Sequence, residues 1–329
     1  MELPNDLVDE ILTRVPVKYV LRCRCVSKEW CSVIDSAKFV EKYLKVSVKR
    51  NRVGLMIQGD KKYLLTDLEY LEDDSAVIDI SEEVGGILNG ARLVNSTNGL
   101  VCLSLLDNNI NAIFLLNPCT RKCKKLPAPG KEFLDNNSLD KYSFCGVGYD
   151  CVSDDYKVLL IQVLDLRGGI MASVYSLKKI AWTPIPNVIS TEKLFVGPMA
   201  GLTFADGAVI WTAFDFASNK PVNFGFDLGL EQFRGLEVCK EDLRLCRISI
   251  ESSRAKEILE NPAFRCFKCP RPVTYLKSHE KILFEMNSRK FVWYDIRRKA
   301  IKIVSLSGIP NPFVSSTYIE SLFPLIEDI

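Results

Sequence analysis

The chain of 329 residues has one histidine and lacks the common catalytic motifs. Its single histidine, His279, lies in the polar, turn-like stretch "KSHEK", where a solvated surface residue is the ordinary interpretation. No G-x-S-x-G elbow, P-loop or H-E-x-x-H motif occurs. The Gly-x-Gly of "GVGYD" is not followed by a helix start, as a dinucleotide site requires. We therefore expect a non-catalytic protein that needs no cofactor.

Membrane-spanning and nucleic-acid-binding signals are also missing. No run of about 18 apolar residues occurs, and the opening Met1-Glu2-Leu3-Pro4 does not resemble a secretory signal. The net charge is +2, and lysine and arginine are scattered among acidic residues without forming a basic stripe. We expect a protein of the cytoplasm or nucleus that contacts neither membrane nor nucleic acid.

Twelve cysteines are present, and in a reducing compartment they are expected to be free and mostly core residues. Zinc is the alternative, since Cys266 and Cys269 have ligand spacing and Cys119 with Cys123 could form a second pair. The two pairs lie in different predicted structural units, so we expect no metal site.

Residues 3–46 have a helical pattern unlike that of the rest of the chain. Leu7, Ile11, Leu12 and Val15 form one apolar stripe. Pro16 is expected to end this first helix, and Ser27 to cap a third one. Between them, Val20, Leu21 and Arg24 predict a second short helix. After the third helix, Phe39, Tyr43 and Leu44 predict a fourth amphipathic segment.

About forty residues cannot bury all of these apolar groups, so part of the helical unit should be a partner-binding surface. Two alternatives stay open at this point. The helices could simply pack on the larger domain, or they could form a helix-turn-helix, although few side chains are suited to reading bases.

The remaining residues are short apolar runs separated by Gly, Asn, Asp and Pro, which is typical of an all-β domain. Five strand pairs align as repeats, and their equivalent apolar positions are Leu65, Leu116, Tyr175, Phe226 and Tyr294. Repeats of about 50 residues with four strands each predict the blades of a kelch-like β-propeller, with a β-sandwich as the alternative. The expected fold is α+β and multidomain, with a three-helix unit over residues 1–46 and a propeller-like domain over 47–329.

The segment "LPNDLVDEILTRVPVKYVLRCRCVSKEWCSVIDSAKF" resembles a plant F-box over residues 3–39. The resemblance implies docking to the Skp-type adaptor of a cullin–RING ubiquitin ligase. It implies an adaptor-binding surface made of Leu3, Pro4, Leu7, Ile11, Leu12, Val15, Pro16, Leu21, Val26 and Trp30.

The later elements "NGLVCL", "LNPCTRKCKKLP" and "GVGYDCVSDDYKV" resemble the F-box-associated domain of plant F-box/kelch-like proteins. The glycines and aspartates of the third element, such as Gly148 and Asp150, are expected to form tight turns between strands. A last strand over residues 316–323 is expected to complete the first blade.

One departure from that family concerns the region before the last strand pair. Phe226 and Tyr294 are 68 residues apart, where two full repeats need about 100. One blade is therefore expected to be truncated, with a loop or short helix over residues 251–265 and Cys266, Phe267 and Cys269 at the rim of the gap.

These resemblances imply the substrate-recognition subunit of a Skp–cullin–F-box ubiquitin ligase, whose catalysis belongs to other subunits. The partners would be the adaptor, the cullin–RING ligase through it, and a protein substrate that the sequence does not name. The alternative is a ligase-independent or degenerate F-box paralogue with impaired substrate binding.

Overall fold

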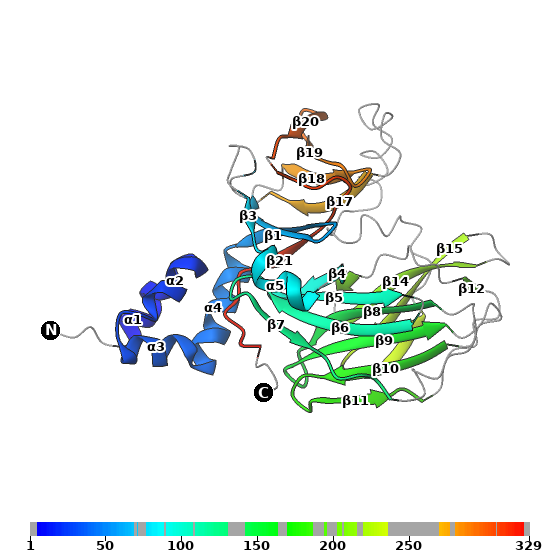
Figure 1. The fold of residues 1–329 in the computed structure, drawn as a ribbon, viewed down its shortest axis with the longest axis horizontal. Helices are drawn as coiled ribbons and strands as arrows, with labels where there is room; N and C mark the ends of the chain where they lie inside the picture. Colours follow the sequence, from blue (N-terminus) through cyan, green and yellow to red (C-terminus); the bar gives the residue numbers. More distant parts are fainter. Residues whose placement is uncertain are drawn as a thin grey trace.

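The computed structural model describes residues 5–68, 71, 77–88, 90–107, 109–130, 142–163, 170–186, 194–195, 203–205, 207–215, 220–235, 270–276, 280–306 and 308–325. A small N-terminal group of helices lies beside a much larger domain of β-sheets (Figure 1). Within the described ranges, no helix has the length and apolar character needed to cross a membrane.

Four helices form the N-terminal unit: α1 (Asn5–Leu12), α2 (Val17–Cys23), α3 (Lys28–Asp35) and α4 (Ala37–Lys49). The predicted cap is confirmed, because Ser27 Oγ accepts a hydrogen bond from the Trp30 N–H at 3.2 Å. Ser36 caps α4 in the same way. The predicted three-helix unit thus has a fourth full helix, and the boundary predicted at residue 46 falls within its last turn.

The first helix ends at Leu12, not at Pro16 as the sequence suggested. Pro16 is instead the N-cap of α2. The reason is that a residue before proline avoids the helical region, so the chain must leave α1 before Val15. Two backbone hydrogen bonds, from Arg14 to Ile11 and from Val15 to Leu12, form the intervening turn.

Within the described residues, the β-domain contains five separate antiparallel sheets, which are numbered here in chain order. The first sheet is β21 (Val314–Ile319), β1 (Val53–Gly59), β2 (Lys62–Asp67) and β3 (Ile78–Asp79). The second is β4 (Arg92–Thr97), β5 (Leu100–Asp107), β6 (Asn109–Asn117) and β7 (Lys122–Lys125). The third is β8 (Tyr142–Asp150), β9 (Asp155–Val163), β10 (Ile170–Ser176) and β11 (Ala181–Pro184).

In the fourth sheet, β12 (Leu194–Phe195) and β13 (Thr203–Ala205) both pair with β14 (Ala208–Asp215), followed by β15 (Lys220–Asp227) and β16 (Gln232–Gly235). The fifth is β17 (Pro270–Tyr275), β18 (Lys281–Met286), β19 (Lys290–Asp295) and β20 (Ala300–Val304). Each of the five predicted strand pairs lies within one sheet, which confirms the repeat. Five sheets also exclude the two-sheet sandwich.

Apolar clusters join these sheets in succession. The cluster around Leu283 and Trp293 joins the fifth sheet to the first, and the one around Met56 and Val101 joins the first to the second. Further clusters join the second to the third and the third to the fourth. This is the blade-on-blade packing of a propeller. Residues 236–269, between the fourth and fifth sheets, lie outside the described residues. The predictions of a truncated blade, of a loop or short helix over residues 251–265, and of Cys266, Phe267 and Cys269 at the rim of a gap are therefore untested.

One turn recurs in four of the sheets, between the third and fourth strands. The last residue of the third strand accepts a backbone N–H through its side-chain oxygen, and the fourth residue after it has a positive φ. The four pairs are Asn117 with Arg121, Ser176 with Ile180, Asp227 with Glu231, and Asp295 with Lys299. Short polar side chains that bind the backbone of their own turn explain why these residue types recur there.

The predicted equivalence of five apolar positions holds for four of them. Leu116, Tyr175 and Phe226 each pack toward the preceding sheet, and Tyr294 lies on the corresponding face of the fifth sheet. The assignment of Leu65 is wrong, because its side chain packs toward the second sheet. Leu64 faces the fifth sheet and is the true equivalent. A shift of one residue along a strand reverses the face of the side chain.

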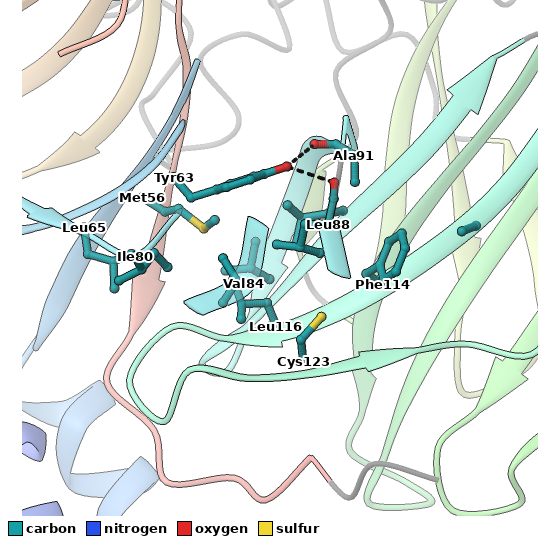
Figure 2. Close-up of a cluster of buried hydrophobic side chains, with 13 residues drawn as sticks. Met56, Tyr63, Leu65, Ile80, Val84, Leu88, Ala91, Phe114, Leu116 and Cys123 are labelled. Carbon is teal, nitrogen blue, oxygen red and sulfur yellow. Dashed lines mark hydrogen bonds between the residues drawn. The ribbon is translucent and has the colours of Figure 1, made fainter. Parts of the chain in front are cut away.

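The expectation of an all-β domain overlooked one helix, α5 (Ser81–Leu88). Two glycines, Gly85 and Gly86, weaken its helical signal in the sequence. Tertiary contacts hold it, since Val84 and Leu88 are fully buried between the first and second sheets. The Tyr63 hydroxyl donates toward the Leu88 and Ala91 carbonyls at 3.0 and 3.1 Å (Figure 2).

The predicted closing strand is confirmed over Val314–Ile319, which pairs antiparallel with β1. Residues 320–323 continue beyond the strand. Because β21 lies at the end of the chain and β1 near its beginning, the first sheet joins distant parts of the sequence and covers an edge of β1 that would otherwise be open.

Candidate partner-binding surfaces

The helical unit has a small apolar core, to which Leu322 from the end of the chain also contributes. Val8, Leu12, Val20 and Ile34 are buried in it, together with Phe39 and Tyr43 from α4. Leu12 is only 2% exposed. Its place in the predicted adaptor surface is therefore corrected: it holds α1 to the other helices and is not available to a partner.

Three large apolar side chains among the predicted adaptor-binding residues are left at the surface, in addition to Pro16. Leu7 and Ile11 are each 51% exposed and share one face of α1, four residues apart. Val26, in the turn before α3, is 62% exposed. Half-exposed large apolar side chains beside a filled core make this a candidate partner-binding surface.

The remaining predicted residues differ in exposure. Val15, Leu21 and Trp30 are partly buried against the helical core, and Pro16 is exposed. Leu3 and Pro4 lie outside the described residues. Sequence reasoning missed Tyr19 and Val48, which are also exposed apolar side chains of this unit. Lys18 and Arg22 lie over the Tyr19 ring at 4.9 and 5.8 Å.

Arg24 lies within the segment that resembles an F-box, and its contact is structural. Its guanidinium donates to Asp35 Oδ2 at 2.7 Å and so joins the end of α2 to the end of α3. The hydrogen bond and the negative charge of Asp35 raise the pKa of Arg24 above its ordinary value. An exposed pair of this kind contributes about 0–1 kcal/mol.

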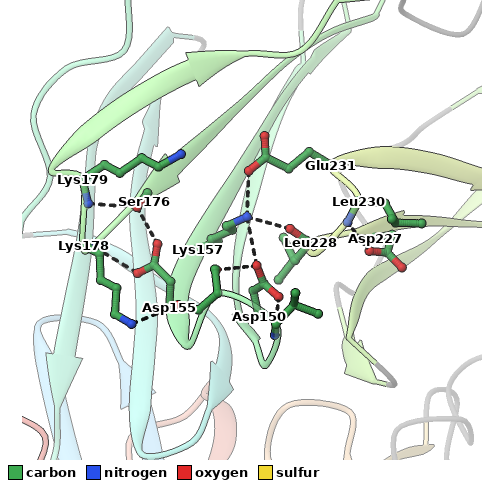
Figure 3. Close-up of polar contacts among 12 residues, drawn as sticks. Asp150, Asp155, Lys157, Ser176, Lys178, Lys179, Asp227, Leu228, Leu230 and Glu231 are labelled. Atoms are coloured by element: carbon green, nitrogen blue, oxygen red, sulfur yellow. Dashed lines mark hydrogen bonds and ion pairs between the residues drawn. The ribbon is translucent and has the colours of Figure 1, made fainter.

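In the β-domain, the "GYDCVSDDYK" element forms a polar cluster between the third and fourth sheets (Figure 3). Lys157 Nζ lies 3.1 Å from Asp150 Oδ2 and 2.7 Å from Glu231 Oε1, and donates to the Leu228 carbonyl at 2.8 Å. Lys157 and Asp150 are buried, so this is an internal ion pair that binds one sheet to the next. The expected turn role holds for Asp150, which accepts the Val152 N–H at 2.9 Å.

The pKa values of this cluster follow from competing effects. Burial disfavours the charged form of Asp150, but hydrogen bonds from Ser153, the Val152 N–H and Lys157 outweigh it and lower its pKa. Burial likewise opposes the charge of Lys157, but Glu231 and Asp150 outweigh it and raise its pKa. Both groups are therefore charged at neutral pH.

Gly148 was expected to form a turn, and that is wrong. It lies within β8, where a Cβ atom would be 2.3 Å from Leu228 Cδ1 and 2.5 Å from Phe204 Cδ2. The glycine is needed because the fourth sheet approaches the backbone of the third. The roles of this motif are thus structural, in turns and sheet contacts.

The described cysteines are free. Cys102 and Cys145 are buried where the second and third sheets meet, as expected of core residues. Cys123 is buried between the first and second sheets, and Cys119 packs on the helical core. No group of metal-ligating side chains occurs among the described residues. Cys266 and Cys269 lie outside them, so the zinc alternative is untested.

The β-domain has two distinct ends. The end near α4 carries the hairpin turns at Asn98–Gly99 and Asp150–Asp155. The first strand of the β-domain, β1, also begins at this end, at Val53. The far end carries the β1–β2 turn at Lys61 and the β18–β19 turn at Asn287. Strands of six to nine residues place the two ends about 20–30 Å apart.

Sequence models of two protein families match different parts of this chain. The sequence model of the F-box domain matches residues 1–42. That of the F-box associated beta propeller domain matches residues 57–251, more than half of the chain. Among solved structures, the six-bladed β-propeller lectin of Aleuria aurantia covers 79% of this chain and 77% of its own, at 12% identity and a TM-score of 0.31, which is too low to carry an argument.

Similar proteins come from Arabidopsis thaliana. The F-box protein CPR1 is 26% identical over 97% of this chain and 88% of its own length. The F-box protein At4g22390 is 32% identical over 59% of this chain and 49% of its own length, so this chain spans about half of that relative. The match of the propeller-domain family over most of the β-domain decides the assignment. The chain belongs to the plant F-box proteins that carry an F-box associated β-propeller domain.

Proposed function

We propose that this protein is the substrate-recognition subunit of a Skp–cullin–F-box ubiquitin ligase. The F-box would bind the Skp-type adaptor, the adaptor would bind the cullin, and the β-domain would hold a protein target for ubiquitination. No group in this chain needs to react. Its contribution is to hold the target near the transfer site, which raises the effective concentration of the reactants.

The observation that carries the proposal is the pair of half-exposed side chains on α1. Leu7 and Ile11 stay outside the helical core although that core is filled. Covering the exposed half of each would contribute about 1–2 kcal/mol at roughly 25 cal/mol per Å². The exposed Val26 extends the apolar surface that we assign to the adaptor.

We assign target binding to the far end of the β-domain. The near end is adjacent to α4 and would lie beside the adaptor. The far end is free of the helical unit, and loops on the rim of a rigid scaffold are the usual place of recognition. The target remains a protein of unidentified kind, and the cytoplasmic or nuclear location remains a prediction.

Binding of a recombinant Skp-type adaptor tests the first step. The double substitution Leu7→Ala with Ile11→Ala should remove about 3 kcal/mol and weaken the Kd roughly 100-fold. Val48→Ala is the matched control, because Val48 is 52% exposed on α4 but outside the proposed surface. It should leave the Kd unchanged. Equal Kd values for the double variant and the parent would contradict the proposal.

Two further variants separate binding from folding. Replacing Leu3-Pro4 by Ala-Ala should abolish adaptor capture and leave the β-domain folded. Leu12→Ala should act through stability, by about 2–5 kcal/mol, since Leu12 is buried. Thermal unfolding monitored beside the binding assay distinguishes the two effects.

The ligase-independent or degenerate paralogue is the second candidate. The alignment with CPR1 extends over 371 positions, more than the 329 residues of this chain, so the relative contains residues that this chain lacks. Affinity purification under proteasome inhibition tests this alternative. Adaptor binding without any target whose abundance changes would favour it.

A further inference from the structure

The segment that follows β21 passes between the helical unit and the near ends of the sheets. In Figure 1 it is the red trace that descends from β21 beside α4 to the C-terminus. Residues 320–325 make up this segment, called here the clasp. It begins with a backbone hydrogen bond from the Glu320 N–H to the Arg52 carbonyl at 3.0 Å.

Glu320 holds two helices of the F-box at once. Its Oε2 accepts the Val17 N–H at the start of α2 at 3.3 Å, and lies 3.1 Å from the Tyr43 hydroxyl of α4. The same hydroxyl lies 3.0 Å from the Val15 carbonyl. Arg52 completes the group, with its guanidinium 5.4 Å from the centre of the Tyr43 ring and Nη1 3.3 Å from the Val15 carbonyl.

The rest of the clasp alternates between the two domains. Leu322 is buried in the core of the helical unit, which Cys119 of the second sheet also contacts. On the other side, Asn117 Nδ2 donates to the Ser321 and Phe323 carbonyls at 3.2 and 3.0 Å. Gly99 allows the close approach, because a Cβ atom there would be 2.1 Å from Ser321 Cβ.

The clasp then continues onto the third sheet. The Phe323 ring lies 4.5 Å from that of Tyr156, and Leu325 is buried in the cluster between the second and third sheets. This six-residue segment thus contacts the F-box and then the second and third sheets. By contrast, the direct connection from α4 to β1 is only Arg50–Arg52, in which Asn51 has a φ of 50°.

We propose that the clasp fixes the orientation of the F-box on the propeller, with Glu320 as its positioning residue. Without it, rotation about the three-residue connection would let the helical unit swing. The inference adds to the proposed function, because an adaptor and a target held on one rigid body keep a constant separation. Burial raises the pKa of Glu320 above its ordinary value. Oε2 of Glu320 acts as a hydrogen-bond acceptor, and the side-chain amide oxygen of a glutamine could accept the same hydrogen bonds.

The test measures the separation of two nitroxide labels in the full chain by pulsed electron resonance. The labels occupy Cys25 in the F-box and Cys151 in the β-domain, both exposed, with the other reactive cysteines replaced by serine. The parent should give one narrow distance distribution. Glu320→Ala should broaden it to several distances, while Glu320→Gln should keep it narrow. Glu82→Ala, at an exposed carboxylate of α5, is the control and should change nothing.

Tyr43→Phe keeps the ring and removes only the hydroxyl, so it serves if Glu320→Ala fails to fold. It should also broaden the distribution. Unchanged distributions in Tyr43→Phe and in folded Glu320→Ala would overturn the proposal. Adaptor affinity, measured in parallel, should stay within a few-fold of the parent. An adaptor that does not bind the parent would refute the proposed function, while the label distances would still decide whether the clasp exists.

Discussion

Removal of the Lys157 ammonium should destabilise the β-domain. Lys157→Met keeps the length of the side chain but leaves Asp150 and Glu231 without their cation and the Leu228 carbonyl without its donor. Breaking a buried ion pair by removing one partner costs about 3–5 kcal/mol. Glu231 is 31% exposed and can be rehydrated, which favours the lower value of about 3 kcal/mol.

Thermal unfolding of the purified protein measures this cost. An unfolding entropy of about 2.1 cal/mol/K per residue over a domain of roughly 280 residues converts 3 kcal/mol into a Tm lower by about 5 °C. The matched control is Lys178→Met, which removes a lysine from the exposed pair with Asp154, whose side chains are 55% and 74% exposed. That change should stay within about 0.5 kcal/mol, or 1 °C.

The dependence on pH gives a second criterion. The pKa of Asp150 is lowered in the folded protein, so its contribution is present above the unfolded value of about 3.9 and is lost as the pH falls through the folded value. The pKa of Lys157 is raised, so its contribution is lost only as the pH rises above about 10.4. The difference between parent and Lys157→Met should therefore shrink at both extremes. Equal Tm losses in the two lysine variants, or a difference that stays constant with pH, would refute this reasoning.

Three further predictions concern the packing at Gly148, the helix cap at Ser27 and the predicted truncated blade. Gly148→Ala should lower stability by about 1–3 kcal/mol through overpacking against Leu228, whereas Gly86→Ala, with open space around it, should raise stability by up to about 1 kcal/mol in thermal unfolding. Ser27→Ala should cost about 1 kcal/mol, seen as faster amide exchange in α3, and unchanged exchange would contradict the cap. Amide exchange across residues 236–275 should be faster than across 99–118, because the spacing there is too short for a full blade, and equal protection would mean that no hairpin is missing.

The parts of the fold that the sequence predicted best depend on local patterns. The cap at Ser27, the first helix and the five strand pairs are signals within a few residues, and the structure contains them. The exposed Leu7 and Ile11 also follow from the pattern, because a short helical unit cannot bury every apolar residue that it has. The repeating polar turns, as at Asn117 and Asp227, are equally local.

The errors arose where a contact distant in sequence decided the outcome. Leu12 and Ile11 are neighbours in the stripe, and only the packing of α3 and α4 shows that one is core and the other surface. Gly148 looked like a turn residue, yet its role comes from Leu228 in another sheet. The helix α5 has weak helical propensity and exists because two sheets bury Val84 and Leu88.

The sequence by itself therefore determined the division into a helical unit and a repeated β-domain, since periodicity and turn chemistry are properties of short segments. Tertiary structure alone decided how the two are joined. Glu320 is more than 270 residues from the Tyr43 hydroxyl that it contacts, and no pattern in either segment indicates the other. The contact exists because β21 must cover the open edge of β1, which carries the end of the chain back to the F-box.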